Sequence, residues 1–466
     1  MDRQPRSPSL ALSVVPVALL MGLMGTAVVI LDASPHLPLI VGSAVLAILG
    51  LRLGHSWKDL QEGMVRGISI GLPAILVLLA IGLLVGSWLA GGVVPLLVVY
   101  GLQLLSPGIF LVACCLICAV VSVVTGSSWT TVGTIGVALV GVGEGLEISK
   151  AMTAGAIVSG AYFGDKLSPL SDTTNLAAGL TEVPLFGHIR HMLWTTVPSM
   201  GIALGIYALL GLEAGGESRE EHITLLVETT EKSFHLTPIL LLAPFSVIVC
   251  LLFRMPALGA ILVGGAVGAV LALTTQGMAP GELISVLEGG FELKTEVARL
   301  NGLLSGGGLE SMYWTIGLVL CALSFGGLLE STGMLETIVR AILKFAVSTG
   351  SLVLSTLVSS IGVNLLTADQ YLSIILPGRM YREAFRDAGL DARNLSRCLE
   401  DAGTMTSPLI FWNTCGATML GALSVSPFLF APFAFFNLLC PLFSAVYGVT
   451  GWTMIRRVEL PGRNTR

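Results

Sequence analysis

The polar run at residues 164–175 combines two carboxylates and a lysine with hydroxyl and amide side chains, inside a very apolar sequence. A charged side chain in the bilayer core costs about 2.5–3.5 kcal/mol on insertion scales, so such residues usually line a path for ions or substrates. Carboxylate, hydroxyl and amide oxygens are the ligands that hard cations prefer. The run therefore predicts an ion or substrate site whose ligands include Asp165, Ser168, Ser171, Asp172, Thr173, Thr174 and Asn175.

Further polar residues elsewhere in the chain could complete this site. Ser127 and Ser128 belong to a Gly-Ser-Ser-Trp-Thr-Thr turn that we interpret as a re-entrant tip. From the C-terminal half we add Asn364, Thr367, Asp369, Asp401, Ser407 and Asn413. Within the whole set, we place Na⁺ at Asp172, Asn175, Asp369 and Asn413.

Two prolines mark expected helix breaks. Pro169 and Pro408 each follow a serine and precede a leucine. Proline lacks a backbone N–H and disrupts the preceding turn, so each break should free carbonyl oxygens that could bind a cation in a protein-lined cavity.

Composition indicates the setting in which this chemistry is placed. The chain has 466 residues, 54% hydrophobic and 11% charged, with a net charge of −5 and a mean hydropathy of +0.88. Long apolar segments recur and alternating strand patterns are absent, so we expect an all-α polytopic membrane protein with about 10–14 transmembrane segments. We divide it into N-terminal helices (1–68), a first repeat (69–212), outside loops and linking helices (213–311), a second repeat (312–453) and a cytoplasmic tail (454–466).

Basic residues predict the orientation in the membrane. Lys and Arg concentrate on the cytoplasmic side. They are frequent at the N-terminus, in residues 52–66 and 377–400 and in the tail, whereas residues 213–236 and 277–311 hold two each. We therefore expect both termini in the cytoplasm of a multi-pass protein of the cell membrane.

An internal repeat accounts for the order of the motifs. Gly82, Gly126 and Pro169 have counterparts in Gly326, Gly362 and Pro408, at nearly constant spacing. The helix near residue 70 leaves a basic loop assigned inside and its counterpart near residue 312 leaves a loop assigned outside, so the halves should have inverted orientation. Inverted repeats place their substrate at the repeat interface near mid-membrane, where helices are broken.

Several charged residues admit a structural interpretation. Asp165 and Lys166 could form an ion pair that only stabilises the break. Glu400 and Asp401 adjoin the arginine-rich loop, so a solvated position at a helix start competes with ion binding. His188 and His191 favour a surface role over pH sensing.

At this point the motifs show a resemblance. Residues 126–136, 160–177, 367–381 and 400–413 resemble signatures of the NhaC-type Na⁺/H⁺ antiporter family, within a wider ion-transporter superfamily. The resemblance implies inverted repeats with re-entrant or broken helices. It points to Asp165, Ser168, Asp172, Thr173, Asn175, Asp369, Ser407 and Asn413, and implies that some relatives exchange malate, lactate or similar acids.

The leading expectation is alternating-access exchange of Na⁺ for H⁺. A buried carboxylate has a raised pKa that a nearby Na⁺ lowers, so the two ions compete for it. Asp172 is the first choice for this role, followed by Asp369 and Asp165. The alternatives are Na⁺- and H⁺-coupled antiport of small organic acids or amino acids, a channel, and a membrane enzyme, for which no motif is present.

We expect no enzymatic activity and no cofactor beyond the transported ions. The expected partners are Na⁺, protons and the lipid bilayer, with no nucleic acid, because no basic stripe is present. A homodimer is compatible with the sequence.

Overall fold

Helices make up the regular structure of the described chain. The computed structural model describes residues 5–31, 33–212 and 219–457, and within these ranges it contains no β-strand, only isolated bridges of Phe291 with Gly306 and of Leu390 with Arg456. The predicted all-α class is therefore confirmed. The N-terminal part comprises α1 (Leu10–Met24), the π-helical η1 (Gly25–Ile30) and α2 (His36–Leu53).

Two sets of helices then follow one another in the same order. The first set is α3 (Trp57–Ala90), α4 (Val93–Leu104), α5 (Pro107–Thr125), α6 (Ser128–Thr131), η2 (Val132–Gly136), α7 (Val137–Gly145), α8 (Lys150–Leu167), α9 (Asp172–Leu180) and α10 (Leu185–Leu212). The second set is α16 (Glu310–Ser331), α17 (Met334–Leu343), α18 (Thr349–Thr367), α19 (Gln370–Asp387), α20 (Ala392–Leu399), η4 (Glu400–Thr404), η5 (Ser407–Leu409), α21 (Thr414–Leu423), α22 (Pro427–Phe430), η6 (Ala431–Phe433) and α23 (Phe435–Thr450).

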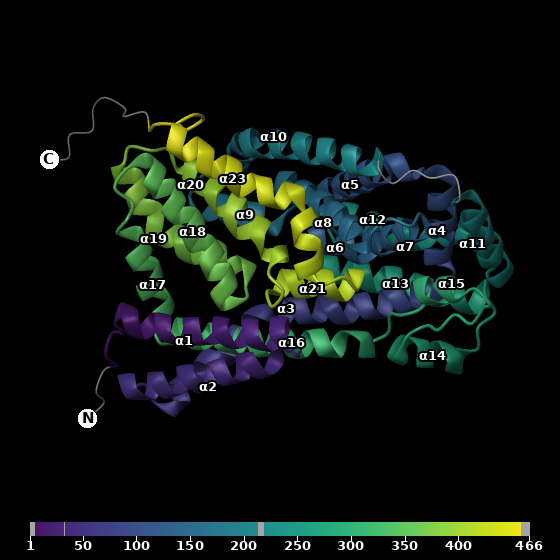
Figure 1. Cartoon of the computed structure of the whole chain (residues 1–466), viewed down its shortest axis with the longest axis horizontal. Coiled ribbons are helices and arrows are strands. Elements are labelled where there is room, and N and C mark those ends of the chain that lie inside the picture. Colours follow the sequence, from purple (N-terminus) through teal and green to yellow (C-terminus); the bar gives the residue numbers. More distant parts are fainter. Residues whose placement is uncertain (1–4, 32, 213–218, 458–466) are drawn as a thin grey trace.

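Between the two sets lie the connecting helices. These are α11 (Arg219–Ser233), η3 (Pro238–Leu241), α12 (Leu242–Leu252), α13 (Ala257–Thr274), α14 (Pro280–Gly289) and α15 (Ala298–Leu303). In Figure 1, α11, α14 and α15 lie at one end of the molecule, whereas α17, α19 and α20 lie at the other. The acidic and basic segments therefore lie at opposite ends, as the charge pattern predicts, and the assignment of the basic end to the cytoplasm stays a prediction.

Long apolar helices confirm a multi-pass membrane protein. Among the described residues, eight helices are long and apolar enough to span a bilayer, and two bent helix pairs raise the number to ten. This number meets the lower limit of the predicted range of 10–14. The broken helices α8–α9 and α20–α21 are interrupted in the middle, so neither forms one continuous apolar span.

Corresponding helices of the two sets run in opposite directions. Along α3 and α16, Gly67 lies against Leu323, while Gly82, further along α3, lies against Gly308, just before α16. Along α10 and α23, the Tyr207 hydroxyl donates to the Phe433 carbonyl oxygen, just before α23, at 2.6 Å. The Tyr447 hydroxyl, near the end of α23, donates to the Trp194 carbonyl oxygen at 3.2 Å. Both helix pairs are antiparallel, so the predicted inverted repeat is present.

The structure changes one predicted correspondence between the repeats. Gly126 ends α5 in the left-handed conformation, and the residue that ends α18 in this way is Ala368. Gly362, the counterpart expected from the sequence, lies inside α18. The Gly-x-x pattern misled the alignment because a helix can end in the left-handed region on a residue other than glycine.

Each repeat contains a hairpin that turns back inside the molecule. Phe110, at the start of α5, contacts Gly143 near the end of α7, so α5 and α6–α7 enter and leave at the same end. In the second repeat, Tyr381 of α19 donates to the Ser355 carbonyl oxygen of α18 at 3.0 Å. We call the turns of these hairpins the first tip (residues 126–128) and the second tip (residues 368–370), and the re-entrant placement of the first tip stays a prediction.

Small residues hold α8 against the first hairpin. A Cβ atom added at Gly160 would lie 2.0 Å from the Cys115 carbonyl oxygen, and one at Gly164 would lie 2.4 Å from that of Ala119. Glycine at these positions lets two helix backbones approach closely, as is common in membrane helices. The packing fixes the end of α8, which carries Asp165 and Lys166.

A candidate ion site at two helix breaks and two hairpin tips

The first helix break lies between α8 and α9. The Ser171 side chain caps α9 by accepting from the Thr174 N–H at 3.4 Å, and the Thr174 hydroxyl donates to the Lys166 carbonyl oxygen at 3.2 Å. The Asn175 amide donates to the carbonyl oxygens of Pro169 and Ser171 at 2.9 and 2.6 Å. The proline break forms as predicted, but side chains take up the carbonyl oxygens that we expected to be free for a cation.

The first tip lies against this break. Gly126 has a φ of +68°, and a Cβ atom there would lie 2.6 Å from the Leu170 Cβ, so glycine serves both the turn and the close approach. The Ser128 N–H and hydroxyl both donate to Asp165 Oδ2, at 3.1 and 2.7 Å. Asp165 is 4% exposed, and its Oδ1 has no hydrogen-bond partner within the described chain. The tip thus holds one carboxylate oxygen and leaves the other available.

The second tip and the second helix break, which lies between α20 and α21, form a similar arrangement. Asp369 is buried and caps α19, accepting from the Leu372 N–H at 2.8 Å. Asn413 caps α21, accepting from the Cys415 N–H at 3.0 Å, and its amide donates to Asn364 Oδ1 at 3.1 Å. This break also has its carbonyl oxygens occupied, since the Asn364 amide donates to Gly403 at 2.5 Å.

A tyrosine joins the two repeats at this level. The Tyr371 hydroxyl, next to the second tip, donates to Asp172 Oδ2 at 2.5 Å. Asp172 itself has an exposed side chain, so the burial that we expected of it is wrong. It is the first residue of α9, directly after the Ser171 cap. For Asp165 and Asp369 the predicted burial is confirmed.

The remaining predicted residues fall into two groups. Asn175 is exposed and Ser127 is half-buried. The buried residues are Ser128, Ser168, Ser171, Thr173, Thr174, Asn364, Thr367, Asp401, Ser407 and Asn413. The four residues predicted to hold Na⁺ are split between exposed α9 positions (Asp172, Asn175) and buried positions of the second repeat (Asp369, Asn413). In the described chain, no three or more His, Cys, Asp or Glu side chains form a metal-holding group.

The carboxylates around the tips have no cation beside them. Asp165 lies within electrostatic range of Asp172, and Tyr371 lies within range of both Asp172 and Asp369. Across the described residues, no lysine or arginine forms an ion pair with any of these three carboxylates. The site therefore concentrates negative charge that its own side chains do not balance.

Lys166 pairs with a different residue from the one expected. Its ammonium forms a fully buried ion pair with Asp401 of the second repeat, and Asp165 binds Ser128, so the proposed Asp165–Lys166 pair is wrong. Asp401 also accepts from the Thr195 hydroxyl at 2.9 Å. Because Lys166 and Thr195 occupy Asp401, we place it outside the ion site. The solvated role considered for Glu400 and Asp401 is wrong as well, since neither is exposed.

The two histidines are buried too. His188 and His191 are 0% and 3% exposed, so the expected surface role is wrong. His188 Nδ1 shares a hydrogen bond of 2.8 Å with the Ser396 hydroxyl. Both lie in α10 near its start, where the flanking Arg190 suggested a surface loop, but α20 covers this face.

Sequence reasoning missed Tyr371 and Gln370. Gln370 Oε1 accepts from the Ser407 hydroxyl at 3.0 Å and so connects the second tip to the second break. Their position directly after Asp369, in a polar turn that follows an apolar run, was the available signal.

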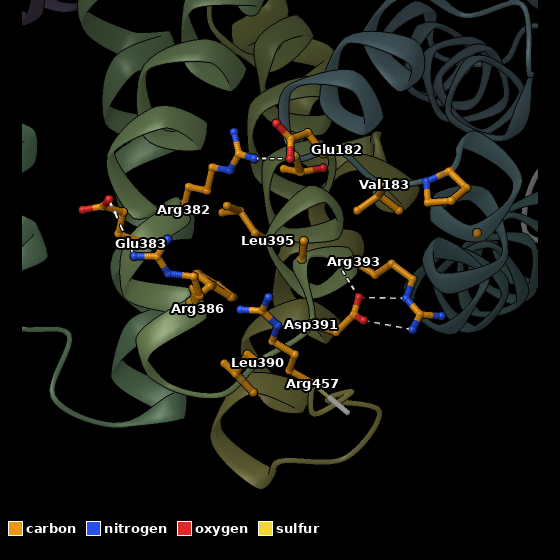
Figure 2. A pocket seen from close by; sticks show the side chains of 15 residues that line it. Glu182, Val183, Arg382, Glu383, Arg386, Leu390, Asp391, Arg393, Leu395 and Arg457 are labelled. Atoms are coloured by element: carbon orange, nitrogen blue, oxygen red, sulfur yellow. Dashed lines mark hydrogen bonds and ion pairs between the residues drawn. The ribbon is translucent and has the colours of Figure 1, made fainter. Parts of the chain in front are cut away.

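Pockets lie at the outer ends of the broken helices. At the basic end, a pocket of about 820 Å³ is lined by the end of α9 and the start of α20, with Glu182 and Arg382 as an ion pair (Figure 2). At the opposite end, a pocket of about 520 Å³ is lined by Glu144, Lys150 and the end of α21. None of the predicted site residues lines either pocket. The two pockets thus lie at opposite ends, and no tip residue lines either of them.

Comparisons with known proteins agree with this architecture. A family model described as the Na⁺/H⁺ antiporter family matches residues 160–452. The chain is 40% identical to the Na⁺/H⁺ antiporter NhaC of Alkalihalophilus pseudofirmus, over 93% of this chain and 94% of that protein. It is also 40% identical to the malate-2H⁺/Na⁺-lactate antiporter of Bacillus subtilis, over 96% of each. The arginine/ornithine antiporter ArcD of Halobacterium salinarum is 37% identical, over 96% of this chain and 93% of that protein.

Proposed function

This chain belongs to the Na⁺/H⁺ antiporter family, and we propose that it exchanges Na⁺ for protons by alternating access at the tips and breaks. As a member of this family it is a multi-pass membrane transporter and not an enzyme. The proposal concerns the identity of its cargo and the residues that carry it.

One observation carries the proposal: Asp165, Asp172 and Asp369 lie around the tips with no paired cation among the described residues. Charge at membrane depth is costly unless it is balanced, so the site requires a cation. Both Na⁺ and H⁺ satisfy this requirement, one as a bound ion and the other by neutralising a carboxylate.

Competition between these two cations gives exchange. Desolvation favours the protonated form of a buried carboxyl, and a neighbouring Na⁺ favours the ionised form, so binding of one ion expels the other. We transfer the exchange role from Asp172 to Asp165, because Asp165 is buried and keeps one oxygen free, whereas Asp172 is exposed. Asp369 is the corresponding buried carboxylate of the second repeat.

The repeat architecture supports alternating access. In inverted repeats, one arrangement of the halves opens the site to one side and the reversed arrangement opens it to the other. We propose that the pockets at the basic end and at the opposite end are the two entrances. Exchange of Na⁺ for H⁺ then occurs as the repeats rock about the tips.

The charges of the site also bear on the alternative cargoes. An organic anion such as malate needs a cationic partner, but Lys166 and Arg397, the buried cations nearby, both face Asp401. A cationic amino acid would instead be attracted by the unbalanced carboxylates. The test therefore includes arginine and ornithine besides malate and lactate.

Reconstitution of the full chain in vesicles with an internal pH-sensitive dye tests the proposal. NaCl, LiCl, KCl, sodium malate, sodium lactate, arginine chloride or ornithine chloride is added separately. We expect NaCl to cause proton movement without any organic ion. Sodium malate and sodium lactate should cause proton movement of the same extent. Proton movement only when an organic ion is present would refute Na⁺/H⁺ exchange.

Variants at the carboxylates test the assignment of the exchange residue. Asp165→Asn should abolish Na⁺-driven proton movement, whereas Asp172→Asn, a matched change on the exposed side of the same break, should retain part of it. The reverse result would return the role to Asp172.

A further inference from the structure

A second group of buried charges lies beside the ion site, on the side of Lys166 away from the tips. We call it the buried charge cluster, and it comprises Lys166, Arg397, Glu400 and Asp401. All four residues are 0% exposed. Lys166 comes from the first repeat, and the other three come from α20 and η4 of the second. The proposed exchange reaction does not use any of them.

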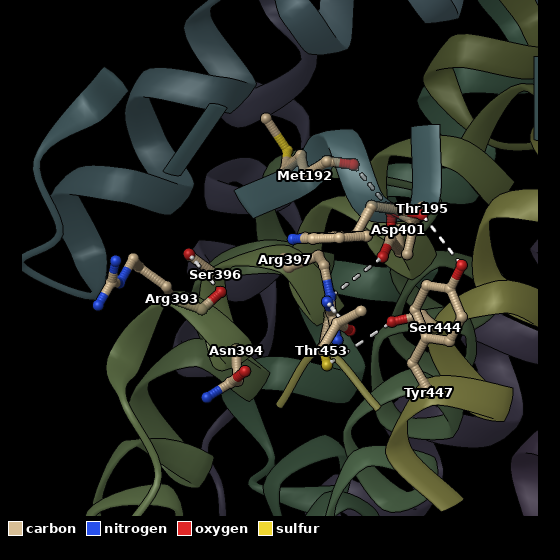
Figure 3. A network of polar contacts seen from close by, with 12 residues as sticks. Met192, Thr195, Arg393, Asn394, Ser396, Arg397, Asp401, Ser444, Tyr447 and Thr453 are labelled. Atoms are coloured by element: carbon tan, nitrogen blue, oxygen red, sulfur yellow. Dashed lines mark hydrogen bonds and ion pairs between the residues drawn. The ribbon is translucent and has the colours of Figure 1, made fainter. Parts of the chain in front are cut away.

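Within the cluster, Asp401 accepts hydrogen bonds through one of its carboxylate oxygens. Its Oδ1 accepts from the Lys166 ammonium and the Thr195 hydroxyl, and its Oδ2 lies 3.9 Å from the Arg397 Nε. Figure 3 shows Arg397 between Asp401 and Thr453, to which it donates a hydrogen bond at 2.8 Å. Asp401 therefore lies between two cationic side chains.

Glu400 differs from its neighbour. Neither of its carboxyl oxygens has a hydrogen-bond partner among the described residues, although the side chain is fully buried. An ionised carboxylate without donors in such a place costs several kcal/mol, on the order of the penalty for any unpaired buried ion. The neutral, protonated form avoids this cost, which makes Glu400 a candidate to hold a proton.

The surroundings of Glu400 make its proton sensitive to charge. The ionisable groups that face it or its cluster are Asp165 and Lys166 of α8, His188 and His191 of α10, Arg397 and Cys398 of α20, Asp401 of η4, and Cys440 and Tyr447 of α23. Toward η4, α19 presents the neutral Ser373 and Ile374, α18 contains no ionisable residue, and α9 has its one carboxylate, Asp172, exposed. With Glu400 protonated, Lys166 and Arg397 face the single charge of Asp401.

Consecutive residues connect this cluster to the ion site. Asp165 binds Ser128 of the first tip, and Lys166 binds Asp401 of the cluster. Both residues belong to the last turn of α8, which therefore joins the ion site to the cluster. A Na⁺ ion that enters the ion site adds positive charge next to a cluster that already has an excess of it, until protons leave in compensation. Added positive charge favours loss of a proton from a neighbouring carboxyl.

We propose that Glu400 is a second proton-carrying group, coupled to the ion site through Lys166. This inference rests on the proposed Na⁺/H⁺ exchange. When Na⁺ binds, the O–H bond of the Glu400 carboxyl breaks and the proton leaves to water. The carboxylate that remains is balanced by the Lys166 ammonium, which keeps its own protons. When Na⁺ leaves, a proton from water restores the neutral carboxyl.

The η4 segment carries Glu400 at the point where α20 leads into the second break. It is a five-residue π-helical turn between α20 and the second break, and such turns are frequent at functional sites. The outer end of α20 lines the pocket at the basic end, through Asp391, Arg393 and Leu395.

Na⁺-induced infrared difference spectra of the full chain test the proposal. In the parent protein, adding Na⁺ should remove absorption of a protonated carboxyl group. Part of this change should be missing in Glu400→Gln, which keeps the shape of the neutral side chain but cannot release a proton. Glu336→Gln, at an exposed carboxylate of α17, is the matched control and should behave as the parent. A spectrum of Glu400→Gln identical to that of the parent would overturn the proposal.

Sodium exchange separates this proposal from the proposed function. Glu400→Gln should retain exchange of radioactive Na⁺ against Na⁺ in vesicles, while fewer protons move for each Na⁺ transported. If the variant does not fold, Glu400→Asp provides the second test, with a shifted carboxyl band expected and an unshifted one contradicting the assignment. A parent protein without any response to Na⁺ would refute the proposed function, and the role of Glu400 with it.

Discussion

The buried ion pair between the repeats allows a quantitative prediction. Lys166→Met removes the ammonium but keeps an unbranched side chain of similar length. Lys166 and Asp401 are both 0% exposed, so the variant leaves Asp401 with only Thr195 and the more distant Arg397. Removing one partner of a buried pair typically costs about 3–5 kcal/mol, because the other charge stays buried without compensation. We expect a loss of unfolding free energy in this range.

Unfolding in detergent micelles, followed by fluorescence, measures this loss in a double-mutant cycle with Asp401→Asn. The double variant should be more stable than the sum of the single effects predicts, by about 1–3 kcal/mol, since it removes both charges. Arg340→Met is the control, because the Arg340–Glu336 pair is exposed on both sides and should contribute only about 0.3–0.5 kcal/mol. Strict additivity of Lys166→Met and Asp401→Asn would refute the reasoning.

Other predictions concern packing and acid stability. Gly160→Ala would bring a Cβ atom to 2.0 Å from the Cys115 carbonyl oxygen, so thermal unfolding should show an unfolding free energy lower by about 1–3 kcal/mol or more. In the control Gly179→Ala, the added Cβ atom meets nothing within 4 Å, so the unfolding free energy should hardly change. At the basic end, the hydrogen bond from Arg393 holds the pKa of Asp391 below its ordinary value. A carboxyl with a lowered folded-state pKa adds stability above its unfolded pKa of about 4 and loses it as the pH falls through the folded-state pKa. Unfolding measured against pH should therefore show a weaker loss on acidification for Asp391→Asn, and an unchanged acid limb would contradict this role.

The membrane fold was predictable because its signals are local and strong. Long apolar runs, separated by short polar segments, predict spanning helices wherever a bilayer must be crossed. The prolines at 169 and 408 marked both breaks, since a proline cannot continue the hydrogen bonding of a helix. The inverted repeat followed from the order of the motifs and from the charges of the loops.

The partners of the charged residues were not predictable in the same way. Lys166 follows Asp165 in sequence, but consecutive helical residues point in different directions, and only the tertiary packing of α8 against η4 brings Lys166 to Asp401. Asp172 was expected to be buried because its polar motif lies within otherwise apolar sequence. Its place directly after a helix cap, which determines its direction, depends on where the break ends.

The histidines of α10 illustrate the same limit. A pair of histidines beside an arginine favours a surface position in sequence analysis, yet His188 and His191 are covered in the structure. The cover comes from α20, about 200 residues later in the chain, and His188 binds Ser396 there. Contacts over such a separation leave no periodic signal in the residues that make them.

The central claim, that Na⁺ and protons compete for buried carboxylates at the tips, is tested most directly by the affinity for Na⁺ as a function of pH. Titration of the purified chain with NaCl should give an apparent Kd that rises by about tenfold for each pH unit below the pKa of the exchange group. Asp165→Asn should remove most of this dependence. An affinity for Na⁺ that does not change with pH in the parent protein would contradict the account.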